Sequence, residues 1–126
     1  MALSHPMALD FTAADIATHL AAATSDALDI LDFGVVEMNQ AGQVLRYNAT
    51  EARYSGLAPA RVVGRHFFSE VAPCSNNRKV AHRFNEAAID ETIEYTFALK
   101  MKPVPVTLRM IKSAEAAQMY LLVRWV

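Results

Sequence analysis

The single cysteine, Cys74, is the side chain of this 126-residue protein that is best suited to covalent chemistry. It stands in the segment GRHFFSEVAPCSNN, residues 64–77, after Pro73 and before Ser75 and Asn76. A lone cysteine is either a small buried apolar residue or a group kept for its reactivity. Proline and short polar residues take the backbone out of regular structure and expose amide groups near the sulfur. The segment therefore favours a point of covalent ligand attachment.

Two histidines could instead serve as the base of a thiol enzyme. His66 or His82 would have to meet Cys74 in the fold, and no segment indicates a substrate. We rank this alternative last and expect no enzymatic activity. The other histidines, His5 and His19, are distant from these two and from each other, without the paired spacing of a zinc site. No metal is expected.

Length and charge exclude several classes of protein. A chain of 126 residues is expected to form one domain with one core. Twelve basic residues stand against 13 acidic ones, for a net charge of −1, and they are scattered, so nucleic-acid binding is not expected. No basic leader and no run of about 18 apolar residues is present, so neither secretion nor a membrane span is predicted. One cysteine fits a reducing, cytoplasmic setting, and we expect a monomer.

The first third of the chain predicts a helix followed by a hairpin. A capping box at residues 12–15 precedes a short helix over residues 13–23, and residues 25–31 add a further helical turn. Strands are then predicted over residues 33–38 and 44–47, joined by a tight turn of sequence NQAG.

The middle of the chain is irregular. Glycine and proline divide residues 48–77 into pieces, with short turns expected over residues 49–54 and 59–63 and a loop around Cys74. A long irregular segment in a small domain usually has a functional reason. Apolar residues at helical spacing then predict an amphipathic helix over residues 80–90.

Alternation of apolar and polar residues returns near residue 93 and predicts three more strands, the last ending at Trp125. Five strands around a helical middle give an α+β fold, an antiparallel sheet with helices packed on one face and an N-terminal helical cap. Residues 1–126 would form one domain, with a cap over residues 1–32 and a core over residues 33–126.

Four segments resemble the photoactive yellow protein family, whose members have a PAS fold. The resemblance covers nearly all of residues 33–126 and is looser before them. Its most specific part is VAPC after FF, together with a tyrosine and a glutamate spaced as Tyr47 and Glu51. The segments are VLRYNA at residues 44–49, VGRHFF at 63–68, VAPC at 71–74 and EYTF at 94–97.

The resemblance implies a blue-light photoreceptor in which a 4-hydroxycinnamoyl (p-coumaroyl) group is attached to Cys74 through a thioester. The family pattern places the phenolate oxygen of this group against Tyr47 and Glu51, and its thioester carbonyl against the backbone amide of Cys74. A phenol titrates near 10, so a buried phenolate at neutral pH needs hydrogen-bond donors that favour the anion. For Glu51 to donate, its pKa must lie about 3 above the ordinary value, a difference of roughly 4 kcal/mol.

Further positions follow the same pattern. Ser55 matches a threonine that supports the tyrosine hydroxyl, and Met101 matches a loop methionine linked to thermal recovery. In contrast, Leu57 stands where well-known members have an arginine at the pocket, and Leu99 replaces a tyrosine, so the photocycle rate is left open. The positions that match the pocket lining are Val36, Phe67, Val71, Ala72 and Phe97.

The family pattern also implies a route to a signal. Light isomerises the chromophore, Glu51 gives up its proton, and the buried charge drives partial unfolding that releases the N-terminal cap. With no room for an output enzyme in 126 residues, an unknown partner protein would bind in trans. The alternative is a light-independent PAS module that binds another ligand or a protein, with Cys74 free.

Overall fold

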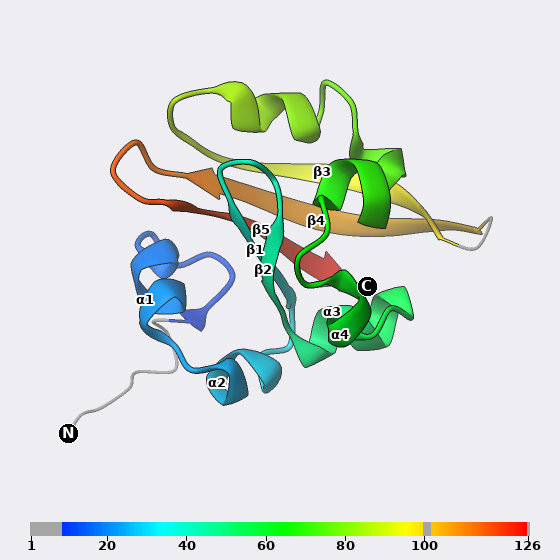
Figure 1. The fold of residues 1–126 in the computed structure, drawn as a ribbon, viewed down its shortest axis with the longest axis horizontal. Helices are drawn as coiled ribbons and strands as arrows, with labels where there is room; N and C mark the ends of the chain where they lie inside the picture. Colours follow the sequence, from blue (N-terminus) through cyan, green and yellow to red (C-terminus); the bar gives the residue numbers. More distant parts are fainter. Residues whose placement is uncertain (1–8, 100–101, 126) are drawn as a thin grey trace.

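The computed structural model describes residues 9–99 and 102–125, and its frame is a five-stranded antiparallel sheet in the order β2-β1-β5-β4-β3 (Figure 1). The expected α+β architecture is confirmed. The long strands β3 and β4 run side by side along their whole length. The strands are β1 Gly34–Asn39, β2 Val44–Tyr47, β3 Ile89–Leu99, β4 Lys102–Lys112 and β5 Gln118–Trp125.

Both faces of the central strands are buried, because successive residues of these strands enter two separate hydrophobic clusters. Along β5, Leu121 and Val123 pack into one cluster, whereas Tyr120 and Leu122 pack into the other. This division follows from the pleat of a strand, which turns alternate side chains to opposite faces. Helical segments must therefore cover the sheet on both sides.

The chain between β2 and β3 covers one face with short helical segments. The turns expected over residues 49–54 and 59–63 are α-helices of two turns or fewer, and Gly56, at φ 78°, ends the first of them in the left-handed conformation that glycine adopts without strain. The segments are α3 Ala49–Ser55, α4 Pro59–Val62, the π-helix η2 Phe67–Val71 and the 3-10 helices η3 Pro73–Ser75 and η4 Ala81–Asn85.

The amphipathic helix predicted over residues 80–90 is wrong. Only a 3-10 helix, η4, forms there, and β3 already begins at Ile89. Of the apolar residues at helical spacing, Val80 and Phe84 are buried, whereas Ala87 and Ala88 are exposed. Pairing of Ile89 with Lys112 extends the β3–β4 ladder into this segment, so tertiary pairing outweighs the local helical pattern.

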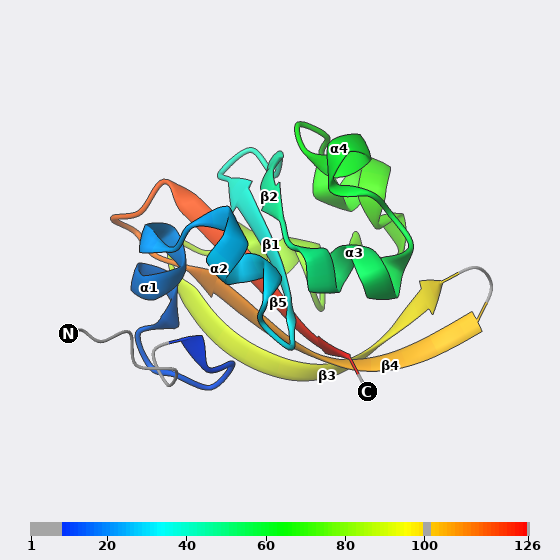
Figure 2. The same cartoon turned by 90° about the horizontal axis from the view of Figure 1, so that it is seen from below.

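The other face of the sheet is covered by the N-terminal segment, with helices α1 Ile16–Ala22 and α2 Ser25–Asp29. Figure 2 shows α1 and α2 on one side of the β1–β2 hairpin and α3 and α4 on the other. The predicted capping box is wrong, because Asp15 is the N-cap of α1 and its side chain forms no capping bond. The apolar residues that this segment buries against the sheet include Phe11, Ile16, Leu20 and Leu28.

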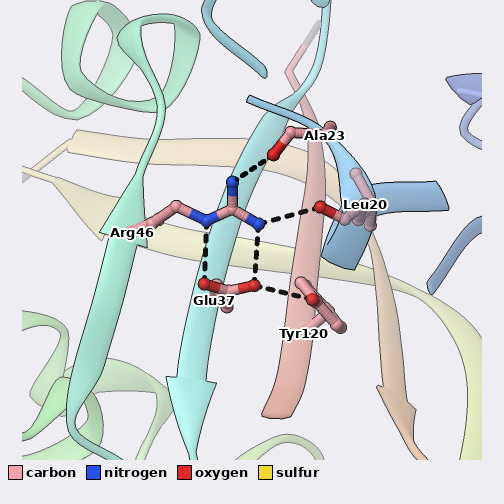
Figure 3. A network of polar contacts seen from close by, with 5 residues as sticks. All are labelled: Leu20, Ala23, Glu37, Arg46 and Tyr120. Carbon is pink, nitrogen blue, oxygen red and sulfur yellow. Dashed lines mark hydrogen bonds and ion pairs between the residues drawn. The ribbon is translucent and has the colours of Figure 1, made fainter. Parts of the chain in front are cut away.

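An arginine on β2 ties the N-terminal segment to the sheet. Arg46 lies opposite Glu37 of β1 in the strand register, and Glu37 lies opposite Tyr120 of β5. Arg46 donates to both Glu37 oxygens (2.8 and 2.9 Å) and also to the carbonyls of Leu20 and Ala23 (2.8 and 2.7 Å) at the end of α1 (Figure 3). Tyr120 donates to Glu37 at 2.6 Å. We call these side chains and the two carbonyls the Arg46 clamp.

Charge pairing explains why a carboxylate is retained at this buried position. Burial raises the pKa of Glu37, but the hydrogen bonds from Arg46 and Tyr120 and the charge of Arg46 outweigh it and hold the pKa below its ordinary value. A second arginine repeats the arrangement on β4, where Arg109 pairs with Asp90 and donates to the carbonyls of Phe11 and Ala13, each at 2.8 Å. The division into a cap over residues 1–32 and a core over residues 33–126 stays a prediction.

Candidate functional site

One cavity brings together most of the residues that the sequence singled out. It lies on the face of the sheet that α3 and α4 cover and takes its walls from β2, α3, η2, η3, β3 and β5. Val36, also predicted to line it, is instead fully buried in the core, and Met101 lies outside the described residues. The cavity is lined by Tyr47, Glu51, Ser55, Leu57, Phe67, Val71, Ala72, Cys74, Phe97 and Trp125.

Cys74 is held in place by its backbone. It lies in the 3-10 helix η3, whose first turn leaves backbone N–H groups without a partner inside the helix. The hydroxyl of Tyr95 on β3 donates to the carbonyl of Cys74 at 2.8 Å, and the amide of Asn77 donates to both that carbonyl (3.2 Å) and the Tyr95 oxygen (2.7 Å). The thiol is half-buried and uncommitted to a disulfide. These contacts therefore fix the backbone of a cysteine that lines the cavity.

Glu51 is placed by the capping of α3. The side-chain oxygen of Asn48, the N-cap, accepts from the backbone N–H of Glu51 at 3.1 Å and from that of Val35 on β1 at 2.9 Å. Its amide nitrogen donates to two further carbonyls. Because Asn48 joins β1 to the first turn of α3, it fixes the Glu51 backbone relative to the sheet.

The Glu51 carboxyl is buried, with only 3% of the residue exposed. Burial raises the pKa of Glu51 to about 7, although a hydrogen bond from Trp125 opposes the rise. At neutral pH a large fraction of this carboxyl is therefore protonated and able to donate a proton. The family resemblance requires a raised pKa at Glu51, and burial of the carboxyl shifts the pKa in that direction.

Tyr47 ends β2 and turns its hydroxyl toward α3. The hydroxyl donates to Oγ of Ser55 at 2.8 Å, and Ser55 also accepts from the backbone N–H of Leu57 at 3.2 Å. Burial, followed by the charge of Glu51, raises the pKa of Tyr47 above its ordinary value. Tyr47 thus stays a neutral hydroxyl, which can donate to one group while accepting from another.

The chemistry of these side chains fits a covalently attached aryl group that carries an oxygen anion. The thiol can form the bond, and the Tyr47 hydroxyl and protonated Glu51 can donate to the anion. The space between the side chains is about 40 Å³, room for about two or three water molecules. A nine-carbon acyl group is larger, so it enters only if the walls shift. Leu57, which is 36% exposed, is the lining residue most open to solvent.

The thiol-enzyme arrangement has no support in the geometry. His66 and His82 line a different cavity from Cys74, and Nδ1 of His66 is bonded to the hydroxyl of Ser69 at 2.9 Å.

The geometry of the described residues also bears on metal binding and on membrane crossing. Within residues 9–99 and 102–125, no group of three or more His, Cys, Asp or Glu side chains could hold a metal ion. No helix in the same residues is both long and apolar enough to cross a membrane.

Sequence reasoning missed three residues of this region. The sequence pattern predicts Trp125 only as the end of the last strand. A buried indole N–H needs an acceptor, and Trp125 lies on the same face as Val123, so a polar partner could have been expected. Tyr95 and Asn77, which hold the Cys74 carbonyl, lie 21 and 3 residues from it, and only the fold reveals that they meet there.

Comparisons with known proteins agree with this fold. The sequence model described as PAS fold matches residues 23–125, which include every residue that lines the cavity. The photoactive yellow protein of Halochromatium salexigens is 36% identical over 107 residues, 82% of this chain and 86% of that protein. That of Cereibacter sphaeroides is 30% identical over 120 residues, 92% and 96% of the two chains. The crystal structure of the photoactive yellow protein domain from the sensor histidine kinase Ppr of Rhodospirillum centenum has a TM-score of 0.79 and 33% identity, covering 85% of this chain and 97% of that one.

Proposed function

The chain belongs to the photoactive yellow protein family of the PAS fold, and from this premise we propose that it is a blue-light photoreceptor whose p-coumaroyl chromophore is attached to Cys74 through a thioester. The observation that supports the proposal best is a single cavity lined by the thiol of Cys74, the hydroxyl of Tyr47 and the carboxyl of Glu51. These are the groups that attachment and anion binding require, and they come from η3, β2 and α3.

Tyr47 and Glu51 would hold the phenolate oxygen. Tyr47 now donates to Ser55, so it must turn its hydrogen toward the phenolate, and Ser55 must then donate to the Tyr47 oxygen instead. Both hydroxyls can do so without moving their oxygen atoms. An anion beside Glu51 disfavours the carboxylate further and raises its pKa above the value of about 7 that burial already gives. Glu51 would therefore be protonated in the dark.

When bound, the chromophore supplies the absorption of blue light and a double bond that isomerises from trans to cis. Glu51 would hold a proton that can be donated into the cavity, and loss of this proton would leave a carboxylate to which only Trp125 donates among the described residues. An unpaired buried charge is costly, so the surrounding structure relaxes toward exposure. Relaxation of α3 would act on Asn48, whose amide donates to the carbonyl of Leu28 in the N-terminal segment and to that of Phe33 just after it.

Release of the N-terminal segment would be the signal. That segment covers the opposite face of the sheet from the cavity, so its departure exposes the apolar cluster around Leu122 and Tyr120. An output protein of unknown identity would recognise the altered surface in trans. The chain itself would act as a cytoplasmic sensor without catalytic activity.

Loading with activated p-coumaric acid tests the attachment. The Cys74 thiolate displaces the activating group, an S–C bond forms, and the leaving group departs with the electron pair. We expect the intact mass to rise by one coumaroyl group in wild type and to stay unchanged in Cys74→Ser. A folded wild type that gains no mass would contradict the proposal and would favour a light-independent PAS module with a free Cys74.

A further inference from the structure

The indole of Trp125 is bonded to the carboxyl at the centre of the site. Its Nε1–H donates to Oε1 of Glu51 at 2.8 Å, and the residue is only 9% exposed. Trp125 lies on β5, 74 positions along the chain from Glu51, and it is the protein's single tryptophan. It is therefore a polar group of the cavity that comes from the sheet rather than from the helices.

Two aromatic rings fix the plane of this indole. Tyr54 of α3 stacks on it with ring centroids 5.4 Å apart and planes 8° apart, and Phe97 of β3 packs against it at 5.7 Å and 36°. Because one contact comes from α3 and the other from β3, packing against two different elements sets the direction of the indole N–H. Rotation of the indole away from Glu51 would disrupt both contacts.

The backbone of β1 restrains the same carboxyl oxygen. A methyl group added at Gly34 would lie 1.9 Å from Oε1 of Glu51, so this oxygen occupies the place that any other residue's Cβ would take. Oε1 is thus held between Gly34 and the Trp125 N–H. No hydrogen bond of Oε2 is found within the described part of the chain.

The chemistry of the two groups then assigns the proton. An indole N–H can only donate, so Oε1 must act as an acceptor. In protonated Glu51 the acceptor oxygen is the carbonyl oxygen, and the hydrogen is on the other oxygen. We propose that Trp125 is a positioning residue that keeps the proton of Glu51 on Oε2, where it is free to be donated into the cavity. This inference rests on the proposed function for the identity of the acceptor, the phenolate oxygen.

The same bond sets how readily Glu51 ionises. Donation to a carboxylate favours the anion, so Trp125 lowers a pKa that burial raises. Within residues 9–99 and 102–125, the titratable groups that share the cavity with Glu51 are Tyr47 on β2 and Cys74 on η3, and no Lys, Arg or His of these ranges lines it. Trp125 is therefore the residue of the cavity that counters burial without carrying a charge.

The inference is tested without any chromophore, by carbon-13 NMR titration of the Glu51 carboxyl in Trp125→Phe. Phenylalanine keeps an aromatic ring but removes the donor, so we expect the acid dissociation constant of Glu51 to fall about tenfold or more. The matched control, Tyr54→Leu, removes the stacking partner and retains the N–H, and we expect a change of less than about threefold. Equal dissociation constants in wild type and Trp125→Phe would overturn the inference.

A measurement on wild type covers the case in which Trp125→Phe does not fold. The only indole N–H resonance of the protein should titrate with the midpoint of Glu51, and it should lose that transition in Glu51→Gln. An indole resonance that is insensitive to pH across this range would overturn the inference. Neither readout uses the chromophore, so failed loading at Cys74 would contradict the proposed function and leave this result intact.

In Trp125→Phe that carries the p-coumaroyl group, Glu51 is a weaker acid than in wild type and is therefore a weaker hydrogen-bond donor to the phenolate. We expect its absorption band to shift to the red in the same direction as that of Glu51→Gln and by a smaller amount. An unshifted band in a variant with a changed Glu51 dissociation constant would show that the Glu51 proton does not point into the cavity.

Discussion

Replacing Glu51 by glutamine should remove a large part of the pH dependence of stability in chromophore-free protein. Burial raises the pKa of Glu51 from its ordinary value of 4.5 to about 7, so between these values the folded state binds a proton that the unfolded state has lost. A raised pKa stabilises the fold fully below pH 4.5, and that stabilisation is lost as the pH rises through about 7. Glutamine keeps an acceptor for Trp125 and cannot ionise.

The size of the effect follows from the pKa difference. Between pH 5 and pH 8 the wild type should lose about 2 to 3 kcal/mol of unfolding free energy relative to Glu51→Gln. Urea denaturation at both pH values measures it, and with a typical slope the midpoint difference between the proteins should change by about 1 M or more. Since both proteins carry the same four histidines, any contribution of these residues cancels in the comparison.

Glu86→Gln is a matched control, because Glu86 is exposed and the same charge is removed. It should follow the pH dependence of wild type. If Glu51→Gln and Glu86→Gln gave the same pH profile, Glu51 would not be a buried carboxyl that is protonated near neutrality, and its assignment as a proton donor would fail.

Three further substitutions test other parts of the structure. Gly34→Ala places a methyl group 1.9 Å from the Glu51 carboxyl, so urea unfolding should show a loss of about 1 to 3 kcal/mol; a neutral substitution would mean that the carboxyl is not held there. Arg46→Met leaves the buried Glu37 carboxylate without its cation, and hydrogen exchange should show faster opening of α1, with partial recovery on adding Glu37→Gln. Unchanged α1 protection would argue against the Arg46 clamp. Leu57→Arg puts a cation at the cavity, so the pKa of Glu51 should fall and the dark recovery of loaded protein should change; unchanged flash-photolysis kinetics would show that this position is unimportant.

The strands could be predicted from the sequence because each central strand serves two buried faces. The unbroken apolar run Leu121, Leu122 and Val123 is a local signal of that burial. The helix expected over residues 80–90 failed for the opposite reason, since pairing of Ile89 with Lys112 is a long-range contact that leaves no local trace. The sequence predicts a loop around Cys74 instead of short helices, because the bounds of these helices depend on packing against the sheet.

The same difference between local signals and long-range contacts applies to the candidate site. Cys74, Tyr47 and Glu51 could be proposed from spacing and resemblance, and the fold places them around one cavity. The partners that set their properties come from distant strands, as with Trp125 for Glu51 and Tyr95 for Cys74. Spacing along the chain carries no information on such contacts, so sequence reasoning identified the reactive groups and missed the residues that orient them.

The most direct test of the proposed photoreceptor is the visible absorption of protein loaded with p-coumaric acid, recorded in the dark, under blue light and again in the dark. We predict a visible band in wild type that bleaches in blue light and returns in the dark, and no such band in Cys74→Ser. A loaded wild type whose band is unchanged by light would contradict a light-sensing role, even with the thioester in place.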